Sequence, residues 1–253
     1  MRFSFFFLIF IFNCSAQNIA SEYVSSNSYN YDVFWGNDLS GCHYFSKSNN
    51  LYKVSKTDTL NYSNNSFGKI SIVETFNMLQ TLVFFKENNA FVLLDAQFNE
   101  INSGIFSEIN CEFLKPASQN ELWFYDSFTQ QIGLYHLNTK KIKFLSNPIK
   151  SLSYSQSDYN FLYWVDAENE CFSISKFGKI SRLGKLNPYH KIFFLNQHEV
   201  FYLFDTKIYY YTFENQLVRG IDIKENLIKN FSYSDGFFSI FTNKQLNTYK
   251  IKK

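Results

Sequence analysis

A short apolar pattern returns along this chain at an almost constant interval, and this periodicity limits the fold more than any other feature. Six apolar runs each end in a pair of large residues, and the second members of the pairs are Phe45, Phe85, Tyr125, Val165, Phe204 and Phe241. The steps between them are 40, 40, 40, 39 and 37 residues. A repeat of this length indicates a propeller or a solenoid, in which each unit is one supersecondary structure.

Each repeat carries the pattern of several short strands. A polar turn and a second apolar run follow the first run, which predicts a β-hairpin. A further strand-like segment lies upstream of each hairpin, and in most units a fourth segment follows it. The six upstream segments are residues 31–35, 70–76, 109–113, 149–154, 191–195 and 228–233. Four strands in about forty residues are the content of one propeller blade.

The sequence therefore predicts an all-β fold, a β-propeller of about six four-stranded blades. The predicted units lie near residues 30–66, 67–106, 107–146, 147–186, 187–225 and 226–253, within a single domain over residues 17–253. A sandwich or an up-and-down barrel gives alternating strands without this repeat. Aromatic residues make up 21% of the chain, which favours strands because Phe and Tyr suit pleated, half-buried surfaces.

The two ends of the repeat array predict how the ring closes. The last unit stops at Lys253 after three strand-like segments, whereas residues 18–25 precede the first unit and belong to none. We expect this N-terminal segment to supply the outer strand of the last blade. It would then cover a sheet edge that is otherwise open to pairing with other chains.

The N-terminus has the layout of a secretory signal peptide. Arg2 precedes an apolar run of about ten residues, and the small-residue sequence Cys14-Ser15-Ala16 follows. Such a run is too short to span a membrane, which takes about twenty residues. Two kinds of processing stay open: cleavage after Ala16, which makes residues 1–16 the signal peptide, or attachment of a lipid anchor to Cys14 at a degenerate lipobox.

No catalytic, cofactor-binding or metal-binding motif is recognisable in the sequence. It contains no phosphate-cradling glycine loop, no GxSxG elbow and no paired Cys/His spacing. We therefore expect no enzyme, no cofactor and no resident metal. Cys42, Cys111 and Cys171 lack the spacing of a disulfide scaffold, so free thiols are favoured, although one disulfide stays open.

A carboxylate recurs directly after the first hairpin strand of three successive units, at Asp126, Asp166 and Asp205. One interpretation is a ring of carboxylates that binds a cation or a cationic ligand on one face. The interpretation that we favour is that each carboxylate accepts hydrogen bonds from amides of its own turn. The other units carry Ser46, Lys86 and Thr242 in this place, so the ring is incomplete.

The charge pattern gives no sign of nucleic-acid binding. The formal net charge is +2, from 24 Lys and Arg against 22 Asp and Glu, and the basic residues are scattered along the chain. Nucleic-acid binding calls for a concentrated basic stripe, whereas the cluster Lys250, Lys252 and Lys253 is explained by a solvated tail. No later segment approaches eighteen uninterrupted apolar residues, so no transmembrane segment is expected.

Two stretches of the chain resemble a group of secreted, uncharacterised β-propeller-like proteins of Bacteroidetes. The first runs from Asn77 to Asp95 and is similar to the pattern LxVFYKDxNxxxxLD, and the second runs from Asn120 to Asp126 and is similar to LWxYD. The similarity continues through Tyr163–Asp166 and Lys207–Tyr211, and so covers most of the mature chain. The resemblance implies a propeller and a Gram-negative envelope location, but no activity that could be transferred.

Together these features predict an exported, non-enzymatic propeller that binds a protein or a glycan in the cell envelope. We expect it in the periplasm or envelope of a Gram-negative bacterium, secreted or held there by a lipid. The alternative is a lyase or hydrolase of sugar polymers that uses carboxylates on one propeller face. Because loops carry function on rigid scaffolds, the polar loops after the first hairpin strands are the first candidates for a binding surface.

Overall fold

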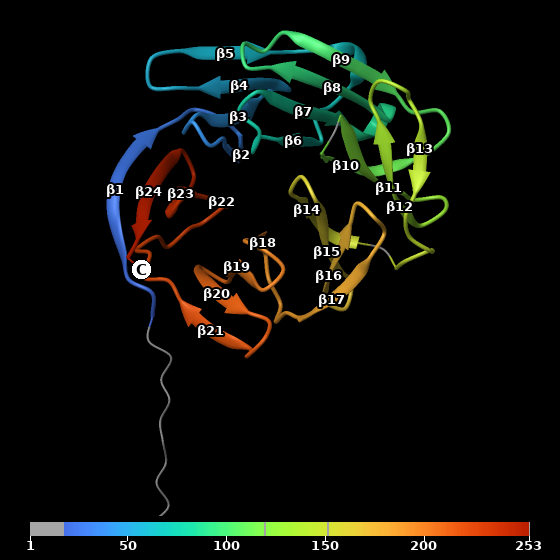
Figure 1. Cartoon of the computed structure of the whole chain (residues 1–253). Coiled ribbons are helices and arrows are strands. Elements are labelled where there is room, and N and C mark those ends of the chain that lie inside the picture. Colours follow the sequence, from blue (N-terminus) through green and yellow to red (C-terminus); the bar gives the residue numbers. More distant parts are fainter. Residues whose placement is uncertain (1–17, 119, 151, 253) are drawn as a thin grey trace, which may run out of the picture.

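The computed structural model describes residues 18–118, 120–150 and 152–252, and the predicted signal peptide with Cys14 lies outside them. The described chain forms a ring of six four-stranded antiparallel sheets, the blades of a β-propeller (Figure 1). Its helical content consists of two short 3-10 turns, η1 (Asn65–Phe67) and η2 (Lys86–Asn88). The predicted all-β fold of about six four-stranded blades is confirmed.

Five blades are built from consecutive strands, and in each the first strand lies innermost. Blade 1 contains β2 (Val33–Asn37), β3 (His43–Lys47), β4 (Asn50–Val54) and β5 (Thr59–Tyr62). Blade 2 contains β6 (Ile72–Glu74), β7 (Gln80–Phe85), β8 (Ala90–Asp95) and β9 (Glu100–Ile105). Blade 3 contains β10 (Cys111–Pro116), β11 (Glu121–Asp126), β12 (Gln131–His136) and β13 (Ile142–Phe144). Blade 4 contains β14 (Leu152–Ser157), β15 (Phe161–Asp166), β16 (Glu170–Ser175) and β17 (Ile180–Lys185). Blade 5 contains β18 (Lys191–Phe194), β19 (Glu199–Phe204), β20 (Lys207–Thr212) and β21 (Leu217–Gly220).

The sixth blade joins the two ends of the chain. It contains β22 (Asn230–Ser234), β23 (Phe237–Phe241) and β24 (Gln245–Ile251), and its outer strand is β1 (Ser21–Ser28). Figure 1 shows this closure, with the blue N-terminal strand beside the red C-terminal one. The prediction that the N-terminal segment completes the last blade is confirmed.

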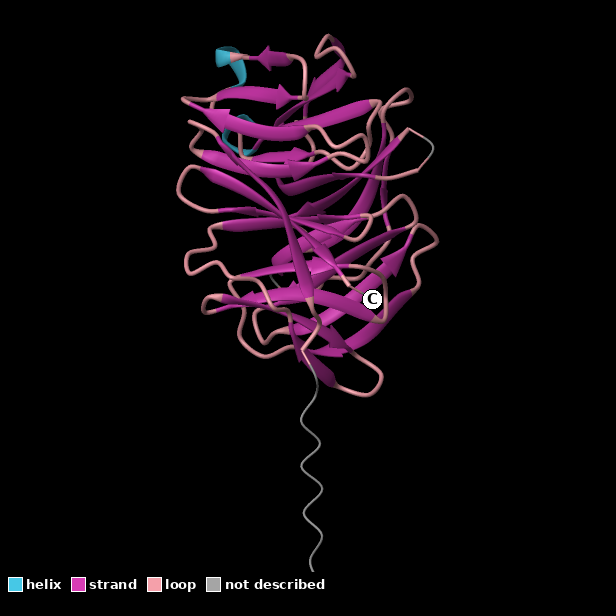
Figure 2. Ribbon diagram, turned by 90° about the vertical axis from the view of Figure 1, so that its left-hand side faces the viewer, coloured by secondary structure: helices cyan, strands magenta, loops and turns pink. Residues whose placement is uncertain are grey.

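The antiparallel order gives the ring two faces, with loops on both sides of the strand layer (Figure 2). We call the exit face the one with the loops that follow the innermost strands, such as residues 38–42 and 75–79. The entry face is the opposite one, where the innermost strands begin and the second strands end. The turns at residues 127–130 and 167–169 lie there.

Aromatic side chains fill the spaces between neighbouring blades. Phe84 and Phe91 of blade 2 share one buried cluster with Phe124 of blade 3, and Tyr163 of blade 4 shares another with Phe194 of blade 5. Each fully buried side chain of this size stabilises the fold by about 1.5–3 kcal/mol relative to its exposed state. The recurring large pairs of the sequence are therefore the contacts that hold the blades together.

The innermost strands begin a few residues later than the sequence pattern predicts in most blades. Segments predicted from Ile70 and Ile109 start as strands at Ile72 and Cys111. Ile70 and Ile109 are nevertheless buried, 7% and 5% exposed, because the connection between blades also passes through the core. Apolar character alone therefore extends the predicted strands into these connections.

Cys42, Cys111 and Cys171 are free thiols in the described part of the chain, in agreement with the favoured prediction. Cys111 and Cys171 are buried, and burial raises the pKa of both thiols. They are therefore protonated packing residues at neutral pH. Within the described ranges, no helix is long and apolar enough to cross a membrane.

Candidate functional site

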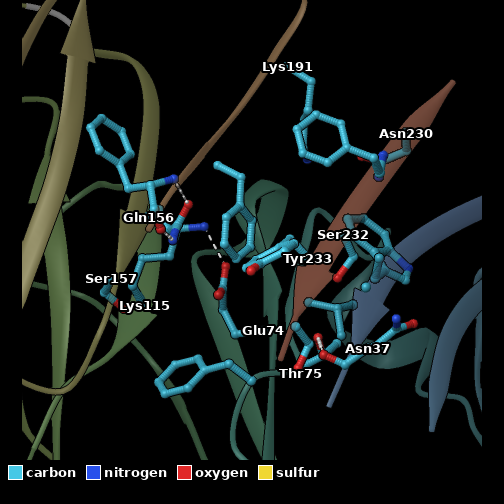
Figure 3. A pocket seen from close by; sticks show the side chains of 18 of the residues that line it. Asn37, Glu74, Thr75, Lys115, Gln156, Ser157, Lys191, Asn230, Ser232 and Tyr233 are labelled. Atoms are coloured by element: carbon cyan, nitrogen blue, oxygen red, sulfur yellow. Dashed lines mark hydrogen bonds and ion pairs between the residues drawn. The ribbon is translucent and has the colours of Figure 1, made fainter. Parts of the chain in front are cut away.

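A cavity of about 560 Å³ occupies the centre of the ring. Innermost strands of all six blades line it, and Figure 3 shows their polar side chains converging on the open space. Sites for small molecules are commonly concave spaces of roughly 300–1,000 Å³ with a few polar groups among apolar ones. The cavity is therefore the first candidate for a ligand site.

A buried ion pair crosses the wall of this cavity. The Lys115 ammonium of β10 donates a hydrogen bond to the carboxylate of Glu74 at the end of β6. The two side chains are 11% and 15% exposed, so both charges are largely removed from water. Pairing compensates much of the cost of removing them, and it links blades 2 and 3 at the channel.

A glutamine takes the corresponding place in the next blade and connects blades 4 and 5. The side-chain amide of Gln156 donates to the carbonyl oxygen of Phe194 at 2.8 Å, and its oxygen accepts from the Phe194 amide at 2.9 Å. The Tyr154 hydroxyl donates to the same Gln156 oxygen at 3.2 Å. Burial, followed by the charge of Glu74, raises the pKa of Tyr154, so this phenol stays protonated.

Lys191 brings a further positive charge into the cavity, from the first residue of β18. Its ammonium forms no hydrogen bond or ion pair with the described residues, and Figure 3 shows it apart from the Glu74–Lys115 pair. Burial, and then the nearby charge of Lys115, lower its pKa to about 8. Lys191 is therefore a cation at neutral pH, held where water solvates it poorly.

The three aspartates singled out in the sequence do not meet, and none of them lines the cavity. Asp126 and Asp166 are the last residues of β11 and β15 and are buried, whereas Asp205 lies beyond the end of β19 and is exposed. Asp205 has a left-handed φ of 55°, typical of a tight turn. Among the described residues, no group of three or more His, Cys, Asp or Glu is placed to hold a metal ion.

The buried aspartates act on their own turns. Asp126 accepts hydrogen bonds from the Asn110 amide at 2.9 Å, the Thr129 amide at 3.2 Å and the Thr129 hydroxyl at 2.7 Å. Asp166 likewise accepts from the amides of Glu168 and Glu170, at 2.8 and 3.0 Å. This is the turn-forming role that the sequence analysis favoured for these residues.

We expect Asp126→Ala to lower the free energy of unfolding by about 1–3 kcal/mol, because buried amides lose their acceptor. The exposed Asp205→Asn variant should change it by less than about 0.5 kcal/mol. Burial alone would raise the pKa of Asp126, but the hydrogen bonds outweigh it and hold the pKa below its ordinary value. The stabilisation of the fold by the Asp126 carboxylate is thus fully present above the pKa that this group has in the unfolded chain. It is lost as pH falls through the lower pKa of the folded chain. Urea unfolding of both variants between pH 7 and pH 2 checks this, and equal stability of Asp126→Ala and wild type at pH 7 would contradict it.

The four histidines are also separate from one another. His43 Nδ1 lies 2.8 Å from the Asn37 side-chain oxygen, and His136 Nδ1 accepts from the amides of its own turn. His190 stacks on Phe204, and His198 lies at an exposed turn. No nucleophile is hydrogen-bonded to these rings among the described residues, so a triad-type arrangement is not formed here.

Several apolar side chains lie in the loops of the exit face, and two of them, Leu39 and Phe76, also line the cavity. Leu39 and Leu79 occupy equivalent loops of blades 1 and 2 and are 69% and 70% exposed. Met78 lies beside Leu79, and Tyr159 in the loop of blade 4 contacts Phe76 with ring centroids 5.0 Å apart. We call these five residues the exit rim.

The cavity and the exit rim were not identified from sequence motifs, because neither has one. A usable signal exists in the repeat itself. Glu74, Lys115 and Gln156 are spaced by 41 residues and lie on the innermost strands of consecutive blades. A polar residue that recurs within an apolar strand at the repeat interval marks the lining of the channel.

Comparison with known proteins supports the fold. No protein-family model matches the sequence, and no curated protein matches it in a sequence comparison. Virginiamycin B lyase from Staphylococcus aureus is similar in structure, with a TM-score of 0.58, 14% identity, and coverage of 84% of this chain and 78% of the lyase. A Bacteroides thetaiotaomicron protein of unknown function gives a TM-score of 0.60, 11% identity, and coverage of 93% and 73%. The WD40 β-propeller domain of Doa1 gives a TM-score of 0.59, 12% identity, and coverage of 90% and 79%. At these identities the likeness is one of fold alone, and the chain is a β-propeller.

Proposed function

We propose that this chain is an exported, non-enzymatic scaffold of the cell envelope that holds a partner protein on its exit face. The observation that carries the proposal is the exit rim, in which the exit-face loops of blades 1, 2 and 4 carry five apolar or aromatic residues. Large apolar side chains that stay exposed in the loops of one face are candidates for a contact with another protein. The predicted signal peptide and the resemblance of the sequence to secreted β-propeller-like proteins of Bacteroidetes support the location.

A protein fits the exit rim better than a glycan does. Leu39, Met78 and Leu79 offer aliphatic surface without hydrogen-bonding groups, whereas a sugar requires polar contacts and exposed aromatic faces. Well-packed apolar anchors at the centre of an interface commonly dominate its binding energy. The exit loops also project from innermost strands that are fixed on both sides by neighbouring blades, so little order is lost on binding.

The carboxylates at the cavity support binding in preference to sugar-polymer cleavage. A glycosidase needs two carboxyl groups that face one substrate bond. Glu74 is engaged by Lys115, and Asp158 accepts hydrogen bonds from the amides of Asn160 and Phe161 and from the Tyr163 hydroxyl. Two of the three cavity carboxylates are thus occupied in structural contacts, and the third, Asp235, lies in an exposed turn of the exit face. We therefore retain the non-enzymatic function as the proposal.

The double variant Leu39→Glu/Leu79→Glu should lose the partner that the wild-type mature protein retains from solubilised envelope. Two carboxylates would need to be desolvated in the interface, so we expect retention to fall at least about tenfold. Phe128→Glu is the matched control, because Phe128 is 81% exposed and lies in a turn on the entry face. Quantitative mass spectrometry of the retained proteins measures both variants.

Three results would count against the exit face as the binding surface. One is equal retention by the double variant and the wild type, and another is loss with Phe128→Glu instead. The third is recovery of no protein at constant stoichiometry by the wild type. Unchanged melting temperatures of both variants are expected, since exposed substitutions of this kind change stability by about 0.5 kcal/mol or less.

A further inference from the structure

We propose that the central cavity binds a small organic anion, whose carboxylate or phosphate group pairs with the ammonium of Lys191. This site is separate from the exit rim and needs no partner protein. The cavity of about 560 Å³ is large enough for a molecule of sugar size. Lys191 reaches it from β18 without a partner among the described residues.

The charges around Lys191 do not balance. Lys115 and Glu74 neutralise each other in the ion pair between blades 2 and 3. Lys191 feels both of these charges, and the repulsion from Lys115 outweighs the attraction of Glu74. This part of the cavity therefore carries one net positive charge, and a single anionic group would complete it.

The strands on either side of β18 do not supply that negative charge. The titratable groups that they contribute to the cavity wall are phenols, Tyr154 from β14 and Tyr233 from β22. Asp158 and Asp235 belong to loops on the exit face, whereas Lys191 is the first residue of its innermost strand and lies toward the entry face. Neither carboxylate is among the charges that act on the pKa of Lys191, which are those of Lys115 and Glu74.

The polar groups near the lysine also suit an organic anion with hydroxyl groups. Ser232 and Tyr233 of β22 face the same open space as Lys191 (Figure 3). The apolar part of the wall includes Phe34 and Phe193, against which a carbon skeleton can lie. A sugar acid or a sugar phosphate would fit this combination of a positive charge, hydroxyl groups and an apolar wall.

The test uses three probes of one shape: glucose 6-phosphate, glucuronate and glucose. Isothermal titration calorimetry at constant ionic strength should show that wild-type protein binds one or both anions and not glucose. Lys191→Met should weaken that binding at least about tenfold, because the charge-assisted contact is lost. Lys207→Met, an exposed lysine of the same blade, should bind like the wild type.

Each outcome decides the proposal. Binding of glucose 6-phosphate alone assigns a phosphate ligand, binding of glucuronate alone assigns a carboxylate, and binding of both shows that charge is the determinant. The proposal is overturned if the wild type binds none of the probes, if glucose binds equally well, or if Lys191→Met binds like the wild type.

A second measurement follows Lys191 in the wild-type protein, and so stays informative if the variant folds poorly. NMR titration of 13C-labelled lysines should give Lys191 a pKa near 8 in the empty protein. The bound anion should raise that pKa toward its ordinary value of 10.5, since it favours the charged form. By the same linkage, affinity for the anion should fall as pH rises through about 8. A pKa that the saturating probe leaves unchanged overturns the site.

Discussion

A chain that begins at Tyr29, and so lacks β1, is expected to melt about 10 °C or more below a chain that begins at Asn18. β1 pairs with β24 from Ser21 opposite Ile251 to Ser28 opposite Gln245. Each backbone hydrogen bond contributes about 0.5–1.5 kcal/mol, and each kcal/mol corresponds to about 2–4 °C in a domain of this size. The loss of several such bonds gives the expected shift.

The N-terminal segment also fastens blade 5 to blade 6, so its removal takes away contacts between these two blades. The amide of Ile19 donates to the Gly220 carbonyl oxygen at 2.8 Å, and the Asp222 amide donates to the Ile19 carbonyl oxygen at 3.0 Å. On the other side, the Lys252 amide donates to Ala20 at 2.9 Å. Without these contacts β24 becomes an exposed edge, and edges of this kind recruit other strands.

The sharpest test adds the missing strand back. A peptide of residues 18–28 should raise the melting temperature of the truncated protein in a concentration-dependent manner, because it binds the folded form. A scrambled peptide of the same composition is the control. The closure contributes little if calorimetry finds the two chains within about 2 °C of each other, or if both peptides act alike.

The ring and its closure could be predicted because the repeat is visible in local strand patterns. Strands β11 and β15 end at Asp126 and Asp166, one residue beyond the apolar runs, which end at Tyr125 and Val165. An incomplete last unit and an unassigned first segment then leave one way to complete the sheet. This prediction required only the local strand patterns and the number of strands in each unit, and the sequence shows both.

The site was harder to predict because its parts come from different blades. Lys115 and Glu74 are 41 residues apart in the sequence, and they come into contact because neighbouring blades place them side by side. Leu39, Leu79 and Tyr159 recur at steps of 40 and 80 residues, but exposure and not residue type distinguishes them from core positions. A Leu is expected in the core from sequence alone, and only the structure shows that these two lie in exposed loops.

Asp38→Ala is expected to lower the free energy of unfolding by about 3–5 kcal/mol, the usual cost of removing one partner of a buried ion pair. The Asp38 side chain is fully buried and lies 3.7 Å from the Lys53 ammonium. It also accepts hydrogen bonds from the Tyr44 hydroxyl at 3.0 Å and from the amides of Ser40 and Cys42 at 2.9 and 3.0 Å. One carboxylate thus holds both the exit loop of blade 1 and the strand beside it.

A second substitution, at Lys53, should restore part of the stability that is lost in Asp38→Ala. Its ammonium also donates to the Ala96 carbonyl oxygen in blade 2 at 3.2 Å, so in Asp38→Ala a buried cation would remain with one neutral acceptor. The double variant Asp38→Ala/Lys53→Met removes that cation and should be more stable than Asp38→Ala alone, since the two sites are coupled. Urea unfolding of the single variants and the double variant gives the coupling free energy. A double variant whose loss equals the sum of the two single losses would show that the charges act independently. The carboxylate would then stabilise the fold only through the turn.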